Sequence, residues 1–161
     1  METNTISATD SYRLLSFKQE VENSFLLNPS TLETQLVENY PNIQPLLNQG
    51  SITINFNLNS LGLNNLLSSI KATKDEEVTF AMNGEYLSLK NSIFNHPITH
   101  CKEKETIVFN RKYLLDCVNF LFDYRKENPE SEITFSFSND DRPTQFISDD
   151  FTYVICPIKV K

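Results

Sequence analysis

The sequence has few of the residues from which common catalytic and cofactor sites are built. Among its 161 residues are only three glycines, three cysteines and two histidines. No glycine-rich phosphate loop is present, which argues against nucleotide binding. Cys101, Cys117 and Cys156 form no CxxC pair and leave one cysteine over, so neither a disulfide framework nor a zinc knuckle is expected. This pattern is typical of the reducing cytoplasm and predicts no cofactor and no metal.

Long apolar runs are also missing. No run approaches the roughly 18 residues of a membrane helix. The first ten residues, METNTISATD, are polar and acidic, whereas a signal peptide starts with basic residues and continues with apolar ones. We therefore expect a soluble, cytoplasmic protein without a membrane partner. Its hydrophobic fraction of 39% is sufficient for a compact core.

Charge is distributed unevenly along the chain. The net charge of −7 disfavours nonspecific nucleic-acid binding by the surface as a whole. Two stretches are nevertheless basic. Lys71 and Lys74 are the only charged residues in the range 58–74, and the range 111–126 has four basic residues against two aspartates. The same two stretches are the clearest predicted helices.

Residues 52–90 predict one supersecondary unit of strand, helix, strand, turn and strand. Apolar residues at spacings of three, four and seven form one stripe on the helix at 58–74, namely Leu63, Leu66, Leu67 and Ile70. Asn83-Gly84, between two alternating runs, predicts a type I′ hairpin turn in which both residues have positive φ. Alternation places Val78, Phe80 and Met82 on one face of the first hairpin strand.

The same order returns at 106–148, with a helix at 111–126 and a closing strand after it. Alternation in the strand at 132–138 directs Ile133, Phe135 and Phe137 inward and Thr134, Ser136 and Ser138 to solvent. The helix carries its own core stripe, formed by Tyr113, Leu114, Cys117, Val118 and Leu121. The prediction is an α+β fold that uses a strand-helix-strand-hairpin unit twice and packs two helices on one side of largely antiparallel sheet.

The first fifty residues lack the elements of a whole domain. They contain ATDSYRLL at 8–15, an acidic middle, and YPNIQPLLNQG at 40–50. Two prolines and a glycine in the last segment predict an extended linker. At the other end of the sequence, Pro157 cannot donate a hydrogen bond within a sheet, so the closing strand should end before it.

These features together resemble the bacterial DNA polymerase III β subunit, the sliding clamp. The similar segments are the repeat with FNRKYLLDCVNFL at 109–121, the ending YVICPIKV at 153–160, ATDSYRLL, and TQLVENYPNIQPLL at 34–47. They occur in the order that the family has. The resemblance implies a DNA-clamp-type third domain at 50–161, preceded at 1–49 by a remnant of the middle domain and the crossing between the two.

The resemblance also implies a binding site. In the family the C-terminal tail turns away from the sheet and lines a hydrophobic pocket, which receives short peptides of DNA polymerase, clamp-loader and repair proteins. The matching residues are Thr9, Tyr12, Arg13, Leu14, Pro41, Pro45, Leu46, Val154, Cys156, Pro157, Ile158 and Lys159. Arg13 could lay its stem along the pocket wall and offer its guanidinium to the peptide.

Family clamps close as dimers around duplex DNA, which they contact electrostatically and without sequence preference. The matching DNA-facing candidates are Lys71, Lys74, Arg111, Lys112, Arg125 and Lys126. An alternative explanation is that positive charge stabilises the C-terminal end of a helix, by roughly 0.3–1 kcal/mol for each residue. It applies to Lys71, Lys74, Arg125 and Lys126. Arg111 and Lys112 stand at a helix start, where that explanation fails.

Other combinations of polar residues give little support for an enzyme. Pro97 discourages a helix through His96 and His100, and in a strand these residues would lie ~13 Å apart at a rise of ~3.3 Å. A surface strand explains them better than a metal site or a nucleophile next to Cys101. The pairs Asp140-Asp141 and Asp149-Asp150 flank a short hairpin and are expected to be solvated turn residues.

Two hypotheses of function remain open. The first is a sliding-clamp-like replication processivity factor, with duplex DNA and peptide-bearing proteins as partners and a possible homo-oligomeric state. The alternative is a truncated, standalone interaction module that keeps the pocket but does not encircle DNA. Neither hypothesis includes catalysis.

Overall fold

The computed structural model describes residues 5–19, 25–28, 30–36, 42–47, 50–138 and 142–159. Within these ranges it contains the helices α1 (Gln44–Leu47), α2 (Ser60–Ala72) and α3 (Arg111–Glu127). The strands of the first half are β1 (Thr5–Thr9), β2 (Arg13–Lys18), β3 (Phe25–Leu27), β4 (Thr34–Leu36), β5 (Ile52–Asn55) and β6 (Glu77–Asn83). Those of the second half are β7 (Tyr86–Lys90), β8 (Asn95–His100), β9 (Lys104–Asn110), β10 (Thr134–Phe137), β11 (Thr144–Ile147) and β12 (Phe151–Ile155).

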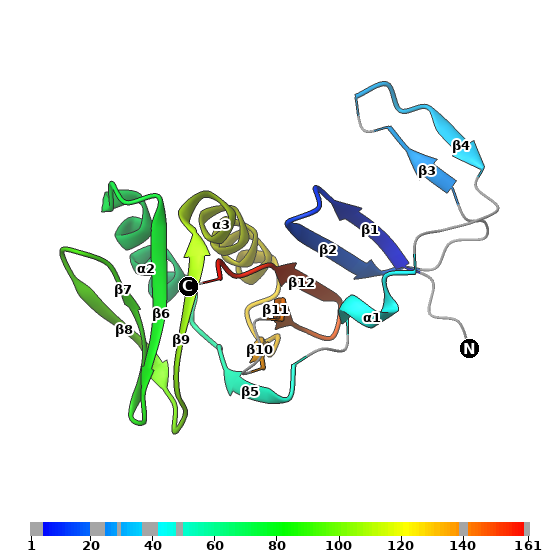
Figure 1. Ribbon diagram of the computed structural model, residues 1–161. Coiled ribbons are helices and arrows are strands. Elements are labelled where there is room, and N and C mark those ends of the chain that lie inside the picture. Colours follow the sequence, from blue (N-terminus) through cyan, green and yellow to red (C-terminus); the bar gives the residue numbers. More distant parts are fainter. Residues whose placement is uncertain are drawn as a thin grey trace.

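The described strands form antiparallel sheets of different sizes (Figure 1). A six-stranded sheet has the order β1-β2-β12-β11-β10-β5, and a four-stranded sheet has the order β8-β7-β6-β9. Strands β3 and β4 form a separate hairpin. No described helix is long and apolar enough to cross a membrane.

The predicted repeat is present, and its two copies exchange their first strands. The copies are β5-α2-β6-β7 and β9-α3-β10-β11. Strand β5 pairs with β10 of the second copy, in the register Ile54↔Phe135, while β9 pairs with β6 of the first copy, in the register Val78↔Phe109. Each of the two larger sheets therefore contains strands of both copies, which binds the repeats into one unit.

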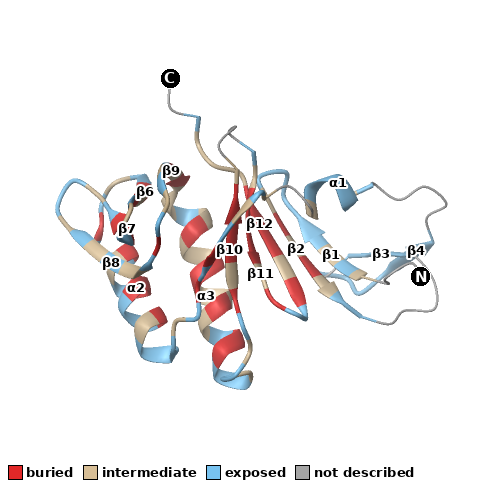
Figure 2. Cartoon of the chain, turned by 90° about the horizontal axis from the view of Figure 1, so that it is seen from below, coloured by how far each residue is buried: buried red, intermediate tan, exposed pale blue. Residues whose placement is uncertain are grey.

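The core lies where helices α2 and α3 cover the two sheets. The helices lie side by side (Figure 2), and both predicted apolar stripes face inward, with Tyr113 only half-buried at the end of its stripe. Phenylalanines from both copies meet in the centre, where the rings of Phe80 and Phe135 lie 5.5 Å apart and those of Phe56 and Phe146 lie 5.0 Å apart. This arrangement confirms the predicted α+β architecture with two long helices packed on antiparallel sheet.

Asparagines define where both long helices begin. The side-chain oxygen of Asn59 accepts a hydrogen bond from the amide of Gly62, and that of Asn110 accepts one from the amide of Lys112. Such caps satisfy main-chain donors that have no partner inside the helix. Helix α2 is therefore slightly shorter than the predicted range 58–74, whereas α3 has almost the predicted bounds.

Two local predictions about strands and turns are wrong. At the β6-β7 turn only Gly84 has a positive φ, of 91°, because Asn83 ends strand β6 and its side-chain oxygen accepts from the amides of Glu85 and Tyr86. In strand β10, Ser136 is buried rather than solvated. A Cβ atom on Gly50 would lie 1.7 Å from the Ser136 hydroxyl oxygen, so the segment that precedes β5 covers this side chain closely.

The predicted extended linker at 40–50 contains a short helix. Helix α1 occupies Gln44–Leu47, and Asn42 accepts a hydrogen bond from the amide of Gln44 through its side chain. Pro45 is compatible with this position because a first helical turn leaves its main-chain nitrogens without helical acceptors. The segment is therefore not fully extended.

Candidate functional site

Strand pairing brings the two most distant predicted segments together. Strand β2 lies next to β12, with Leu14 opposite Val154 and Arg13 opposite Ile155. Just beyond the paired strands, the amide of Cys156 donates to the carbonyl of Tyr12 at 2.9 Å. The segments that carry ATDSYRLL and YVICPIKV therefore form one continuous surface, which we call the strand-end site.

One face of the site is apolar and is partly covered by helix α1. Directly opposed residues of antiparallel strands project to the same face, so Leu14, Val154 and Gln145 share a face. Leu14 and Val154 are 4% and 3% exposed. The side-chain amide of Gln145 donates to the carbonyl of Leu46, which fixes α1 over this face. Leu46 itself remains 38% exposed and offers an apolar side chain to solvent.

An aromatic pair lies at the end of the same strands. Tyr12 is 57% exposed and stacks on Tyr113 of helix α3, with ring centroids 5.5 Å apart. Half-buried Cys156 and Pro157 follow β12 nearby in the chain. The helical spacing predicted Tyr113 only as a core residue, although its place at the edge of the apolar stripe could have indicated a partly exposed ring.

The β1-β2 turn is held in an uncommon conformation. Ser11 has a φ of 75°, a region that side chains other than glycine seldom occupy. The hydroxyl of Thr9 donates to the carbonyl of Arg13 at 2.7 Å and accepts from the amide of Ser11. Asp10 accepts from the amides of Tyr12 and Arg13, and these bonds, with the Arg13 guanidinium, outweigh the effect of burial and hold the pKa of Asp10 below its ordinary value.

Arg13 differs from its predicted role at the pocket wall. It projects to the face that α3 covers, because it lies opposite core residue Ile155. Its Nε donates to Asp10 at 2.9 Å, its Nη1 donates to Asp116 at 2.5 Å, and its Cζ lies 5.0 Å from the Tyr113 ring centroid. Burial alone would lower the pKa of Arg13, but the bonds to Asp116 and Asp10 raise it. Arg13 therefore uses much of its hydrogen-bonding capacity on side chains of this chain.

Burial raises the pKa of several side chains near Arg13. Burial, together with the neighbouring Cys117 thiol, raises the pKa of the Tyr153 phenol. Burial also raises the pKa of Cys117 and, reinforced by Asp10, that of Cys156. A thiol with a raised pKa is a weak nucleophile. The site is therefore suited to packing and hydrogen bonding rather than covalent chemistry.

The chain leaves the six-stranded sheet as predicted and then bridges to strand β9. Strand β12 ends at Ile155, before Pro157. The amide of Ile158 donates to the carbonyl of Val108 at 2.7 Å, which forms an isolated bridge to strand β9. The tail therefore spans from one sheet to the other, and the main chain of Ile158 is used in that bridge. Pro45 and Lys159 are exposed, and Pro41 lies outside the described residues.

The six DNA-facing candidates do not form one free basic surface. Lys71, Lys74 and Lys112 are exposed, and Arg111 is half-buried. Lys126 is exposed but pairs with Asp123 at 2.9 Å. Arg125 is only 4% exposed and its Nη1 donates to the carbonyls of Pro129 and Ser131, so the prediction that it faces DNA is wrong. Its burial follows from its place on the inner face of α3.

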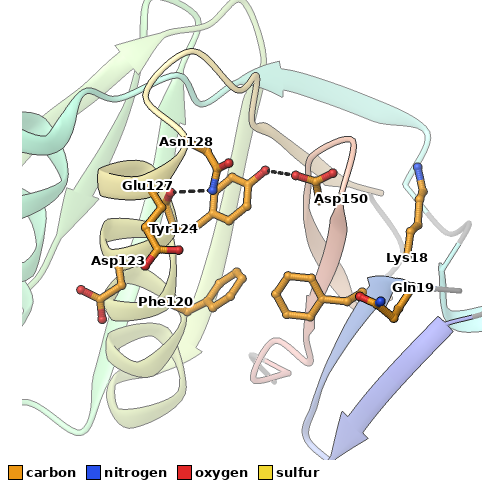
Figure 3. Close-up of a pocket in the computed structure, with 9 residues that line it drawn as sticks. Lys18, Gln19, Phe120, Asp123, Tyr124, Glu127, Asn128 and Asp150 are labelled. Carbon is orange, nitrogen blue, oxygen red and sulfur yellow. Dashed lines mark hydrogen bonds between the residues drawn. The ribbon is translucent and has the colours of Figure 1, made fainter. Parts of the chain in front are cut away.

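A cleft outside the predicted site lies between the C-terminal part of α3 and the end of β2. The hydroxyl of Tyr124 donates to Asp150 at 2.7 Å. Figure 3 shows this bond at the cleft, with Phe120 below it. The cleft has a volume of about 480 Å³, and its charged lining residues are Lys18, Asp123, Glu127 and Asp150. Three carboxylates against one amine disfavour a phosphate group at this end of α3.

The remaining candidate groups are structural. His96 and His100 lie on edge strand β8, as the strand prediction requires, and the His100 ring packs on Tyr86 with centroids 4.3 Å apart. Burial raises the pKa of Cys101. Asp149 and Asp150 lie in the β11-β12 turn, whereas Asp140 and Asp141 are outside the described residues. No group of potential metal ligands occurs in the described part of the chain.

Comparison with known proteins identifies the fold. No protein-family model matches the sequence, and no curated protein matches it either. Among solved structures, the DNA polymerase β subunit of Streptococcus pyogenes gives a TM-score of 0.71 at 18% identity, covering 97% of this chain and 54% of the other. The DNA polymerase III β chain of Streptococcus pneumoniae gives a TM-score of 0.67 at 22% identity, and the match covers 96% of this chain and 53% of the other.

A third neighbour is the sliding clamp of Bartonella birtlesii, solved with bound griselimycin, with a TM-score of 0.67 at 17% identity and coverages of 97% and 54%. At these identities the likeness is one of fold. This chain spans about half the length of the clamps that it matches. Its structural neighbours are bacterial DNA polymerase III β subunits, and its described residues have the fold of a sliding clamp over that length.

Proposed function

We propose that this protein is a sliding-clamp-like, non-enzymatic binding protein that recruits DNA polymerase, clamp-loader and repair proteins through short peptides. The observation that carries the proposal is the convergence of Leu14, Leu46 and Val154 at one site on a chain with the clamp fold. In this proposal residues 50–161 are a clamp third domain and residues 1–49 a reduced middle domain. Such a protein would act in the cytoplasm, where bacterial DNA is replicated.

The chemistry of the strand-end site supports an extended peptide as the ligand. Leu46, on the helix that Gln145 holds over this sheet face, is exposed and offers an apolar side chain to a leucine or phenylalanine of the peptide. The Tyr12-Tyr113 pair offers a second flat surface at the strand ends. An extended peptide presents alternate side chains to the surface, so two separated contacts of this kind would fix its direction.

Fluorescence anisotropy tests the proposal with a labelled peptide of the Gln-Leu-x-Leu-Phe type. We expect saturable binding that is weakened at least about tenfold by Leu46→Asp, because a buried contact to one leucine is worth roughly 1.5–3 kcal/mol. The matched control is Leu61→Asp, which changes an equally apolar, exposed residue on α2. Wild-type protein that is folded yet does not bind the peptide would contradict the proposal.

The second candidate function is a standalone module that binds clamp partners without encircling DNA. Two observations favour it: Arg125 is buried, and the carboxylates of Asp123, Glu127 and Asp150 surround the cleft at the same end of α3. The exposed cations Lys71, Lys74 and Lys112 remain as candidates for weak DNA contact. Because family clamps close as dimers and this chain spans only 54% of one such neighbour, more than two copies of it would be needed to surround a duplex in the same way.

A topological assay separates the two candidates. The protein is incubated with nicked circular duplex DNA and a purified clamp loader, and the protein that stays with the DNA is measured at rising salt. A ring would remain on the circle at salt concentrations that remove electrostatic binders, and would be released when a restriction enzyme linearises the DNA. Loss from circular and linear DNA at the same salt concentration would favour the module.

A further inference from the structure

Two carboxylates on opposite sides of one guanidinium connect the β1-β2 turn to helix α3. Arg13 Nε bonds to Asp10 within the turn, and Arg13 Nη1 bonds to Asp116 on α3. The Arg13 side chain is 22% exposed, whereas those of Asp10 and Asp116 are 44% and 42% exposed. We call this arrangement the Asp10-Arg13-Asp116 clip.

The clip acts on a turn that needs external support. The turn is short, its residues Asp10, Ser11 and Tyr12 are exposed, and Ser11 has the unfavourable φ of 75°. Such a conformation persists only where the surrounding structure holds it. Asp10 supplies part of that support through the amides of Tyr12 and Arg13. Among the described residues, Asp116 is the one that connects this network to a long helix through an ion pair.

The same clip determines where the exposed aromatic surface lies. Tyr113 stands one helical turn before Asp116 and receives both the Tyr12 ring and the Arg13 guanidinium. With Arg13 bound to Asp116, the main chain at Tyr12 is held close enough for its ring to stack. Without that bond, Tyr12 would rely on the ring contact and on the hydrogen bond from Cys156 to its carbonyl.

We infer that Asp116 is a positioning residue of the strand-end site: through Arg13 it holds the 10–13 turn so that Tyr12 lies against Tyr113 before a peptide arrives. The inference rests on the proposed peptide-binding function for its consequence, but the ordering of the turn is a property of the free protein. Preorganisation of this kind raises affinity because less conformational freedom is lost on binding.

The test compares three single variants with the wild type. Asp116→Asn removes the charge and keeps the shape of the side chain, and Asp116→Glu restores the charge. Asp123→Asn is the matched control, since it makes the same charge change on the same helix at a residue whose ion pair is with Lys126. Amide NMR shifts and heteronuclear NOEs of residues 10–13 report the turn, and peptide anisotropy reports the site.

In the free protein, Asp116→Asn should shift the amides of residues 10–13 and lower their NOEs, while the amides of helix α2 stay unchanged. Its peptide affinity should fall about two- to fivefold, the range that a partly exposed ion pair permits. Asp116→Glu should recover most of this loss, and Asp123→Asn should cause none.

Two outcomes would overturn the inference. Unchanged shifts and NOEs in Asp116→Asn would show that the clip does not order the turn, whether or not any peptide binds. Equal loss of affinity in Asp116→Asn and Asp123→Asn would assign the effect to net charge. Absence of peptide binding by the wild type would instead refute the proposed function and leave the NMR result to decide the role of the clip.

Discussion

The side-chain amide of Gln145 donates to the main-chain oxygen of Leu46 at 2.5 Å, and this bond joins helix α1 to strand β11. Gln145 is almost completely buried, and it shares a sheet face with Leu14 and Val154. The bond therefore fixes the one exposed leucine of the strand-end site in relation to the buried ones.

Gln145→Leu should release helix α1 while leaving the volume of the side chain almost unchanged. Loss of one buried hydrogen bond predicts a decrease in the free energy of unfolding of about 1 kcal/mol. Urea denaturation measures this decrease, and limited proteolysis should cut the segment 42–47 faster than in the wild type. An unchanged proteolysis rate at 42–47 would show that other contacts hold α1.

Gly50→Ala should destabilise the protein because its new Cβ has no room. The atom would lie 1.7 Å from the hydroxyl oxygen and 2.8 Å from the Cβ of Ser136. Overpacking of this kind costs about 1–3 kcal/mol, measurable by urea denaturation. The double variant Gly50→Ala, Ser136→Gly removes both clashing atoms and should recover part of the loss. If the double variant were as unstable as Gly50→Ala, the loss of stability would come from the backbone at residue 50 and not from the clash with Ser136.

Arg125→Ala should be much more damaging than Lys126→Ala. Arg125 is buried and its Nη1 bonds to the carbonyls of Pro129 and Ser131, so the substitution should lower the free energy of unfolding by about 2–4 kcal/mol. Lys126 is exposed and its ion pair with Asp123 should contribute at most about 0.5 kcal/mol. Thermal and urea unfolding of both variants check the difference, and equal effects would contradict the structural role given to Arg125.

The contact between Asp75 and Ser92 should make stability depend on pH in the acid range. The Asp75 carboxylate accepts from the hydroxyl of Ser92 at 2.7 Å and from its amide, and these bonds hold the pKa of Asp75 below its ordinary value of 3.8. A pKa that is lower in the folded state stabilises the fold above the unfolded value. This stabilisation is lost as pH falls through the folded pKa.

The matching experiment compares the thermal midpoints of wild type and Ser92→Ala. We expect a constant difference above about pH 5 that shrinks as pH falls below about 4. Ser68→Ala is the control, since its hydroxyl donates to the uncharged carbonyl of Asn64 and its effect should not change with pH. A difference for Ser92→Ala that stays constant down to pH 2.5 would refute the explanation.

Local periodicity accounts for the elements that could be predicted. The stripe from Leu63 to Ile70 and the alternation from Val78 to Met82 each depend on residues only a few positions apart, and both are buried as predicted. The end of strand β12 before Pro157 likewise follows from the main-chain N–H group that proline lacks. Predictions of this kind need no knowledge of distant partners.

Long-range pairing explains the rest. Nothing local in β5 or β9 shows that each pairs with a strand of the other copy, or that Ser136 is covered by the segment at Gly50. The positions of Tyr113 and Asp116 in the strand-end site depend on how α3 packs against β2, so spacing within the helix could not reveal them. Pairing within motifs was predictable from local pattern, whereas contacts between motifs were not, except that the resemblance placed ATDSYRLL and YVICPIKV at one site.

The position of β2 between β1 and β12 has a consequence for how the chain folds. Arg13 pairs with Ile155, so nearly all of the described chain must be in place before this contact can close. During synthesis, which proceeds from the N-terminus, the β1-β2 hairpin emerges long before residues 151–155, and β2 cannot pair with β12 until they follow. Closing such a long loop is entropically unfavourable and slow. The strand-end site should therefore be among the last parts of the molecule to form, and newly made chains should expose an unpaired strand edge until then.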